Sequence, residues 1–336
     1  MTNFDLKNTF DVIIIGAGPI GLACGIEAQK AGFDYVIIDK ACLVNSIYNY
    51  PVNMVFFSDS TKLEIGKIPF TSSNPKPTRA EALEYYRRVS VYYGLNIRLF
   101  EEVEKVDSIN DKYSLRSNKA SYVAKNIIVA TGFYDTPIAL NIPGEELNKV
   151  THYYRDPHYY TMQNVVVIGA SNSSVDSALE TYRKGAHVTM VVREPEIGEH
   201  VKYWVRPDIL NRIKDGSITA WFNSELTEIR PGEVDIKTPQ GLVTIPNDFV
   251  LAMTGYQPNF ELLDEIGINF STDKKLLPDY NENSMETNQR GVYMAGVVCG
   301  GMDTHQFAIE NSREHGGKII KDILEKMKII NRVMEN

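Results

Sequence analysis

Residues 11–21 read DVIIIGAGPIG, an apolar strand that leads into a glycine-rich turn, and this stretch decides the fold of the chain. Residues 22–31 are predicted as a helix, and a second apolar strand, YVIID, follows at residues 35–39. Strand, glycine turn, helix and strand in this order predict a βαβ unit with a dinucleotide bound at the turn. The fold class is therefore α/β.

Each glycine of this turn is needed for a different physical reason. Gly16 is expected to take backbone angles that other residues avoid, and Gly18 leaves room for a pyrophosphate close to the backbone. Gly21 lets the helix pack near the strand, and the helix N-terminus offers unpaired N–H groups to the anion. Asp39 ends the second strand and suits the free diol of an adenosine ribose, which predicts FAD at this turn.

A second turn of this kind lies in residues 164–174, which read NVVVIGASNSS, and the next strand, residues 187–192, leads to Arg193. Ser171 and Ser174 stand where the pattern has glycines, so this turn offers hydroxyl donors in place of open space. A basic residue at the strand end suits a ribose that carries a 2′-phosphate, which predicts NADPH at this turn. The alternative for Arg193 is a solvated charge at the end of a strand.

A loop after the second strand carries further charge. His200, Lys202 and Arg206 lie in it and could complete a phosphate pocket. The alternative is ordinary surface charge, and the sequence leaves both interpretations open.

The composition is that of a folded globular protein. Its 336 residues are 43% hydrophobic and 23% charged, enough material for two domains of ordinary size. The formal net charge of −8 argues against nucleic acid or an anionic membrane surface as a general partner. No apolar run approaches the ~18 residues of a membrane span and the N-terminus lacks a signal-peptide pattern, so we expect a cytoplasmic protein without a membrane partner.

Further predicted elements echo the first unit. A helix is expected over residues 78–93, with Ala82, Tyr85, Tyr86 and Val89 on its buried face. Short strands are expected near residues 97–100, 103–109, 113–116 and 127–132, and after the second βαβ unit to about residue 245. Strands at residues 249–255 and 291–296 and a helix from about Thr304 to Lys328 complete the prediction.

The strand that ends in Thr-Gly at residues 127–132 is repeated at residues 249–255, as the glycine turn is repeated. This duplication predicts two Rossmann-like dinucleotide-binding domains, with one inserted into the other. The FAD-binding domain is expected at residues 1–133 and 249–336, and the NADPH-binding domain at residues 134–248.

Several motifs together resemble the two-dinucleotide-binding flavoproteins along nearly the whole chain, in the thioredoxin-reductase-like branch. They are GAGPIG (16–21), IIVATG (127–132), MTGYQPN (253–259) and GVYMAG (291–296). More specific stretches resemble the bacillithiol-disulfide reductase family: SIYNYP (46–51), FFS (56–58), KYWVRP (202–207), EN (310–311) and HGG (315–317). The resemblance implies an NADPH-dependent FAD oxidoreductase, usually a homo-oligomer. It would pass hydride through the flavin to a small-molecule or small redox-protein acceptor, such as a low-molecular-weight disulfide.

Candidate site residues fall into three sets. The expected FAD contacts are Gly16, Gly18, Pro19, Gly21, Asp39, Tyr48, Phe56, Val103, Thr131, Gly132, Gly296, Thr304 and Gln306. The expected NADPH contacts are Gly169, Ser171, Asn172, Ser173, Arg193 and Lys202. No catalytic residue is certain, and no metal site is expected.

Asp176 and His305 are the two catalytic candidates. Asp176 matches an acidic position in the second helix of the resembled reductases, which implies a role in orienting the nicotinamide. His305 lies near the expected start of the last helix, whose N-terminus could face the flavin N1/O2 edge. A helix-cap role is the alternative for His305.

Residue 20 departs from the resembled family, whose members that act on the disulfide carry a cysteine after the proline of the first turn. A thiol at a helix N-terminus has a lowered pKa and can attack a disulfide, whereas Ile20 can do neither. We therefore expect poor electron transfer to such a disulfide unless Cys24 or Cys299 takes that role. The three cysteines lack CxxC spacing, and a structural role is the alternative for each. Val297 is a second departure, since many relatives have an aspartate there.

Three other functions remain open at the level of sequence. A flavin monooxygenase is one, because IPG (142–144) and HYY (152–154) partly resemble its fingerprint, although the glycine before the histidine is absent. A ferredoxin or flavodoxin–NADP reductase is another, since that branch also lacks CxxC. The third is a flavin-bound redox sensor that turns over slowly with every acceptor.

Overall fold

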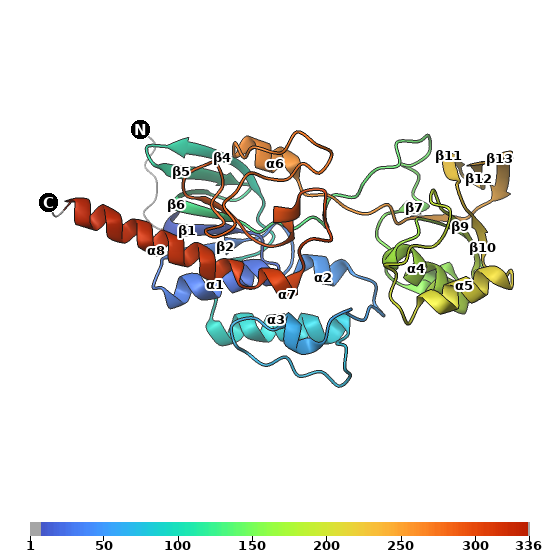
Figure 1. Cartoon of the computed structure of the whole chain (residues 1–336), viewed down its shortest axis with the longest axis horizontal. Helices are drawn as coiled ribbons and strands as arrows, with labels where there is room; N and C mark the ends of the chain where they lie inside the picture. The colour runs from blue at the N-terminus through green and yellow to red at the C-terminus, as the bar shows by residue number, and fades with distance from the viewer. Residues whose placement is uncertain (1–7, 335–336) are drawn as a thin grey trace. The chain divides into compact units, whose positions relative to one another are not determined.

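The computed structural model describes residues 8–334, with side chains to residue 328 (Figure 1). The chain divides into two compact units. In the described part, unit 1 contains residues 8–48, 58–136 and 256–334, and unit 2 contains Asn49–Phe57 and Pro137–Gly255. Residues 1–7 and 335–336, the ends of the predicted first domain, lie outside the described part.

These boundaries differ from the predicted ones at residues 133/134 and 248/249. Strand β14 (Phe249–Ala252), which the prediction placed in the first domain, pairs in parallel with β8 (Asn164–Ile168) in the sheet of unit 2. Asn49–Phe57 also belong to unit 2, where the Val52 N–H donates to the Arg155 carbonyl at 2.8 Å. Both differences arise from pairing between distant segments, which a local pattern does not encode.

Unit 1 is built on one seven-stranded sheet, in the order β3-β2-β1-β6-β5-β4, with β15 also paired to β6. Its strands are β1 (Thr9–Ile15), β2 (Tyr35–Ile38), β3 (Ile97–Arg98), β4 (Val103–Ile109), β5 (Lys112–Ser117), β6 (Ser121–Val129) and β15 (Val292–Met294). The pairs among β3, β2, β1, β6 and β15 are parallel, and β4-β5 and β5-β6 are antiparallel. The carboxyl ends of β1, β2 and β6 therefore meet at one edge, where the first glycine turn lies.

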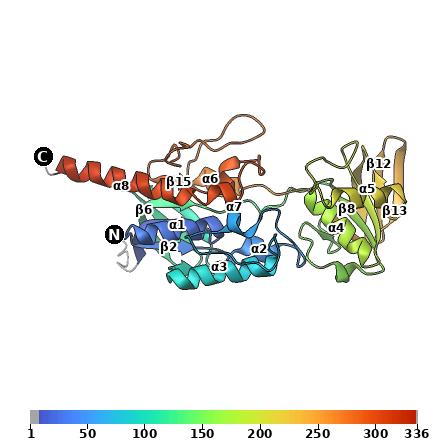
Figure 2. The same ribbon diagram turned by 60° about the horizontal axis from the view of Figure 1, so that its bottom comes forward.

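The helices of unit 1 are α1 (Pro19–Lys30), α2 (Asn45–Asn49), α3 (Arg79–Tyr93), α6 (Phe260–Glu265), α7 (Ile309–Ser312) and α8 (His315–Met334), with 3₁₀ turns η2 (Ser60–Leu63) and η4 (Val297–Gly300). The face predicted for α3 is buried, and Thr78 and Glu81 form a capping box at its start. Helix α8 lies alongside α1 (Figures 1 and 2). The two backbones are close, because a Cβ on Gly316 would lie 2.9 Å from the Cα of Cys24.

The helix predicted from Thr304 to Lys328 is wrong at its start. Residues 301–308 form turns, α7 is a single turn, and α8 begins only at His315. The Asn311 side chain accepts from the Ala308 N–H at 2.8 Å and donates to the Gln306 carbonyl at 3.0 Å. These local side-chain bonds compete with a continuous helical ladder.

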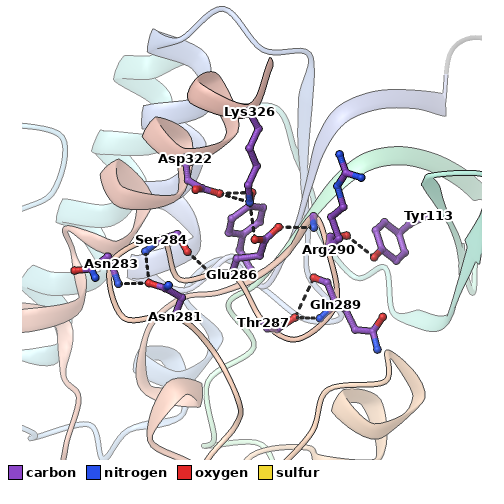
Figure 3. A network of polar contacts seen from close by, with 12 residues as sticks. Tyr113, Asn281, Asn283, Ser284, Glu286, Thr287, Gln289, Arg290, Asp322 and Lys326 are labelled. Carbon is purple, nitrogen blue, oxygen red and sulfur yellow. Dashed lines mark hydrogen bonds and ion pairs between the residues drawn. The ribbon is translucent and has the colours of Figure 1, made fainter. Parts of the chain in front are cut away.

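A polar network joins α8 to the loop that precedes β15 (Figure 3). The Lys326 ammonium lies 2.5 Å from a Glu286 carboxylate oxygen and 2.6 Å from one of Asp322. The Tyr113 hydroxyl on β5 donates to the Arg290 carbonyl at 2.7 Å. Helix α8 and β5 are thus tied to the same loop.

Unit 2 contains a parallel sheet in the order β10-β9-β8-β14-β7 and an antiparallel sheet in the order β11-β12-β13. Its other strands are β7 (Val150–Thr151), β9 (His187–Val191), β10 (Thr219–Trp221), β11 (Glu225–Arg230), β12 (Glu233–Thr238) and β13 (Gly241–Pro246). Helices α4 (Asn172–Arg183) and α5 (Arg206–Lys214) and the 3₁₀ turn η3 (Pro157–Tyr160) complete it. None of the helices within residues 8–334 combines the length and the apolar composition of a membrane-spanning segment.

Candidate functional site

The first glycine turn has the geometry that a dinucleotide needs. Gly16 has a φ of +112°, and a Cβ there would lie 2.4 Å from the Ala130 carbonyl oxygen. A Cβ on Gly21 would lie 1.8 Å from the Gly16 carbonyl oxygen, so the helix could not start here with any other residue. Gly18 has no atom within 4 Å of the position of a Cβ, so the space beside it is open to a ligand. The turn therefore fits the pyrophosphate of FAD.

Asp39, directly after β2, is fixed by the same turn. Its carboxylate oxygens accept from the Ala17 N–H at 2.6 Å and from the Ala41 N–H at 2.8 Å. Burial raises the pKa of this carboxyl, and the two backbone N–H groups oppose that shift. The carboxylate is thus held at the carboxyl edge of the sheet, with lone pairs left to accept from a ribose.

A cavity that is partly open to solvent lies at this edge. Five predicted FAD contacts line it together: Gly16, Asp39, Val103, Thr131 and Gly132. The structure therefore brings residues that are far apart in the chain together around one space.

Several residues that line this cavity were missed by sequence reasoning. They are Ile15, Ile38, Lys40, Glu101, Glu102, Phe133, Asp135, Thr136, Asn259 and Leu262. Glu101 is buried, accepts from the Ser117 hydroxyl at 2.6 Å, and its N–H donates to the Asp39 carbonyl at 2.8 Å. The paired acids directly before the strand of Val103 were the available signal.

Gly296 marks a second place in unit 1 where the backbone lies close to another segment, here the start of α1. Its φ is +88°, and a Cβ there would lie 3.3 Å from the side chain of Ile20 in α1. Its N–H donates at 3.1 Å to Nδ1 of His315, a buried residue that the sequence analysis used only as part of a motif. Burial lowers the pKa of His315 to about 4, with Lys318 as a smaller cause, so the imidazole is neutral and its Nδ1 accepts.

The remaining predicted FAD contacts are more dispersed. Pro19 opens α1, whereas Tyr48 is exposed in unit 1 with the Arg79 guanidinium 5.6 Å from its ring. Phe56 is buried in unit 2, with its ring 6.3 Å from that of Tyr50. Thr304, His305 and Gln306 lie in the turns before α7, so they do not begin a helix as predicted.

The three cysteines are free thiols, and burial raises the pKa of each. Cys24 is fully buried, with a pKa raised to about 12, and Cys299 is 1% exposed. Cys42 is partly buried, and its Sγ lies 3.5 Å from Oδ1 of Asn45. A buried thiol with a raised pKa is a poor nucleophile, so neither Cys24 nor Cys299 is suited to replace a thiol at position 20.

The second turn repeats the first with altered chemistry. Gly169 has a φ of +115°, and a Cβ there would lie 2.9 Å from the Met253 carbonyl oxygen. Ser171 is the N-cap residue of α4, and its hydroxyl lies 3.0 Å from Nε2 of His200. Ser174 is buried and donates to the Ser171 carbonyl at 2.8 Å, so this hydroxyl is used within the turn.

The charged residues predicted to contact NADPH near the second turn differ in their exposure and in their partners. Arg193 is exposed, two residues beyond β9. Lys202 forms an ion pair with Asp176 on α4, 2.7 Å between Nζ and Oδ2. Asn172 accepts from the Lys202 N–H at 2.8 Å, while Ser173 is exposed.

Comparisons with known proteins agree with this architecture. A family model described as pyridine nucleotide-disulphide oxidoreductase matches residues 13–296. The chain is 42% identical over 316 residues to bacilliredoxin reductase Bdr of Bacillus subtilis, covering 94% of this chain and 97% of that protein. It is 39% identical to the solved structure of bacillithiol disulfide reductase Bdr (YpdA) from Staphylococcus aureus, with a TM-score of 0.92 over 95% of this chain and 99% of that one.

A more distant relative is a ferredoxin–NADP reductase of Ignicoccus hospitalis, 26% identical over 306 residues, covering 86% of this chain and 90% of that protein. The fold class and the family predicted from the motifs are confirmed. The chain belongs to the pyridine nucleotide-disulphide oxidoreductase family, in its bacillithiol disulfide reductase branch, and is an oxidoreductase that uses FAD and NADPH.

Proposed function

We propose that this chain passes hydride from NADPH through FAD to a low-molecular-weight disulfide of the bacillithiol type. One NADPH and one proton then convert one disulfide to two thiols and NADP⁺. The observation that carries the proposal is the pair of glycine turns, each at the carboxyl ends of the parallel strands in its own sheet, with a strand-end Asp39 near one and Arg193 near the other. The disulfide as acceptor comes from the name of the Staphylococcus aureus relative, bacillithiol disulfide reductase.

The chain's own residues bind and orient the cofactors. The open space at Gly18 and the carboxylate of Asp39 suit the pyrophosphate and ribose of FAD. The turn at Gly169 and the exposed guanidinium of Arg193 suit the pyrophosphate and 2′-phosphate of NADPH. FAD, when bound, supplies the hydride chemistry, and the protein supplies position.

The sequence alone predicts poor electron transfer to a disulfide, because Ile20 replaces the family's thiol. We propose instead that the disulfide takes its electrons directly from the flavin, without a cysteine of this chain. Ile20 stands where a nucleophilic thiol would act, and Cys24 and Cys299 are buried with raised pKa values. Since attack on a disulfide needs an accessible thiolate, no mixed disulfide with these two cysteines is expected, and burial also raises the pKa of the remaining thiol, the partly buried Cys42.

A second candidate is reduction of a small electron-carrier protein. The isoleucine at position 20 favours it, because electron transfer to ferredoxin or flavodoxin needs no thiolate.

A cytoplasmic location and a homo-oligomeric state, both expected from the sequence, are part of the proposal for the disulfide reductase. Light scattering on the purified protein tests the second of these.

An anaerobic acceptor screen tests the function. The protein is reduced with one equivalent of NADPH, and flavin reoxidation is followed after addition of bacillithiol disulfide, ferredoxin, flavodoxin or oxygen. We expect the disulfide to reoxidise the flavin fastest and to yield two thiols per NADPH. Reoxidation by ferredoxin or flavodoxin alone would replace the proposal with the second candidate.

A further inference from the structure

The segment between β9 and α5, residues 197–205, lies on the first turns of α4, and we name it the clamp loop. Its Lys202 N–H donates to Oδ1 of Asn172 at 2.8 Å, and Nε2 of His200 lies 3.0 Å from the Ser171 hydroxyl. Both partners belong to the start of α4, where the second glycine turn ends.

The clamp loop is held from its other side by packing. Ile197 and Val201 are buried in the hydrophobic core of unit 2. The Arg206 guanidinium, at the start of α5, donates to the carbonyls of Gly198 and Ile197 at 3.2 Å each. The loop is therefore a built part of unit 2, and its shape depends on specific contacts.

The Lys202 ammonium is committed to Asp176. Nζ lies 2.7 Å from Oδ2, with the side chain of Lys202 12% exposed and that of Asp176 25% exposed. Asp176 is four residues after Asn172, so the two lie on one face of α4 and Lys202 contacts both. Burying an ammonium costs solvation, and a paired carboxylate offsets that cost only in a fixed geometry.

We propose that Lys202 and Asp176 are positioning residues, which clamp residues 197–205 onto α4 and so preform the binding site for the pyrophosphate of NADPH. Neither residue contacts the coenzyme. The inference rests on the proposed function, and it replaces two roles expected from the sequence, a phosphate ligand for Lys202 and a nicotinamide contact for Asp176.

The variants Asp176→Asn and Lys202→Met separate the two roles. If Lys202 were a phosphate ligand restrained by Asp176, Asp176→Asn would free the ammonium and tighten NADP⁺ binding. The clamp predicts the reverse, because the neutral amide holds the ammonium poorly and the loop loses its shape. We expect each single variant to weaken coenzyme binding about fivefold to tenfold. The double variant should bind as well as the weaker-binding single variant, because both substitutions remove the same Lys202–Asp176 interaction.

Isothermal titration calorimetry of the oxidised, FAD-loaded protein with NADP⁺ and with NAD⁺ measures this without turnover. A clamp acts on the pyrophosphate site, so both coenzymes should lose affinity by the same factor. Lys202→Arg should restore most of the binding, since a guanidinium can also pair with Asp176. Wild-type protein that bound neither coenzyme would contradict the proposed function, whatever the variants do.

Asp208→Asn is the matched control, because its carboxylate pairs with Arg183 and Arg212 in unit 2, whereas its contact with the clamp loop, from its N–H to the Val205 carbonyl at 3.1 Å, is a backbone bond that the substitution keeps. It should leave both affinities unchanged. Tighter NADP⁺ binding by Asp176→Asn, a loss confined to NADP⁺ in Lys202→Met, or lower thermal stability with unchanged affinity would each overturn the clamp. If Lys202→Met does not fold, Lys202→Gln, which removes the charge and keeps a polar side chain, provides the same comparison.

Discussion

At the residue scale, we expect the two strand-end residues of opposite charge to select the dinucleotide that each unit binds. Asp39 and Arg193 were both identified from the sequence, because each follows a strand that begins at a fixed distance from its glycine turn. The structure adds that Asp39 is fixed by two backbone N–H groups, whereas Arg193 is exposed. A prearranged carboxylate and a free guanidinium predict different consequences of mutation.

Asp39→Ala should weaken FAD binding by about 1.5–3 kcal/mol, the scale of a charge-assisted hydrogen bond in a partly buried site. Asp39→Asn should lose less, because one amide oxygen can still accept from the turn. Fluorescence titration of the apoprotein with FAD measures both, and Asp34→Ala, an exposed acid of unit 1, is the control. Unchanged FAD retention in Asp39→Ala would contradict the assignment.

Arg193→Ala should lower kcat/KM for NADPH about tenfold, or roughly 1.4 kcal/mol, and spare NADH. The reason is that only NADPH offers a 2′-phosphate to the guanidinium. Steady-state kinetics with both coenzymes measure it, with Arg183→Ala as a control arginine of unit 2. Equal losses with both coenzymes would show that Arg193 acts on something other than the 2′-phosphate.

His315 predicts a pH dependence of folding stability. Its folded pKa, lowered to about 4, lies below the unfolded value near 6.5, so the unfolded chain takes up the proton first as the pH falls. The contribution of neutral His315 to the free energy of unfolding is complete above pH 6.5. It is lost progressively as the pH falls to about 4, and the loss is at most about 3 kcal/mol. Urea unfolding at pH 7.5 and pH 5 should show a smaller difference for His315→Gln than for wild type. The exposed His158→Gln should behave as wild type; an equal loss in all three proteins would exclude His315 as the source.

At the scale of elements, the sequence predicted strands and long helices well where apolar periodicity is clear. The face of α3 and the strands of both βαβ units were found, since their patterns are local. The start of α8 was missed, because side-chain bonds of Asn311 and glycine turns interrupt the apparent pattern. The clamp loop was missed as a unit, because its contacts join residues that are far apart in the chain.

The α1–α8 contact gives a paired prediction on adjacent glycines. Gly316→Ala should destabilise the fold by about 1–3 kcal/mol, because its Cβ would lie 2.9 Å from the Cα of Cys24 and neither backbone can move freely. Gly317→Ala meets no atom within 4 Å and should be neutral or stabilising by up to about 1 kcal/mol through helix propensity. Chemical denaturation of both variants measures the difference. Equal stabilities would mean that α1 and α8 do not pack as closely as described.

At the scale of the whole molecule, the duplication was visible in the sequence as two turns and two Thr-Gly strands. The exact division was not, since β14 and Asn49–Phe57 join unit 2 only through long-range pairing. In the candidate FAD site, the glycine turn, Asp39 and Thr131 were predicted, whereas Glu101 and Asp135 were missed, because neither belongs to a dinucleotide-binding motif. The residues alone do not identify the electron acceptor, because position 20 carries isoleucine in place of the cysteine that would have indicated a disulfide.

The central claim is that NADPH reduces the bound flavin and that a low-molecular-weight disulfide then takes the electrons without any cysteine of this chain. The most direct measurement is anaerobic stopped-flow reoxidation of NADPH-reduced protein by bacillithiol disulfide, in wild type and in the Cys24→Ala/Cys42→Ser/Cys299→Ala variant. The account predicts reoxidation at the same rate in both proteins, with two thiols formed per NADPH. Loss of reoxidation in the cysteine-free variant, or none in wild type while ferredoxin or flavodoxin is reduced, would contradict it.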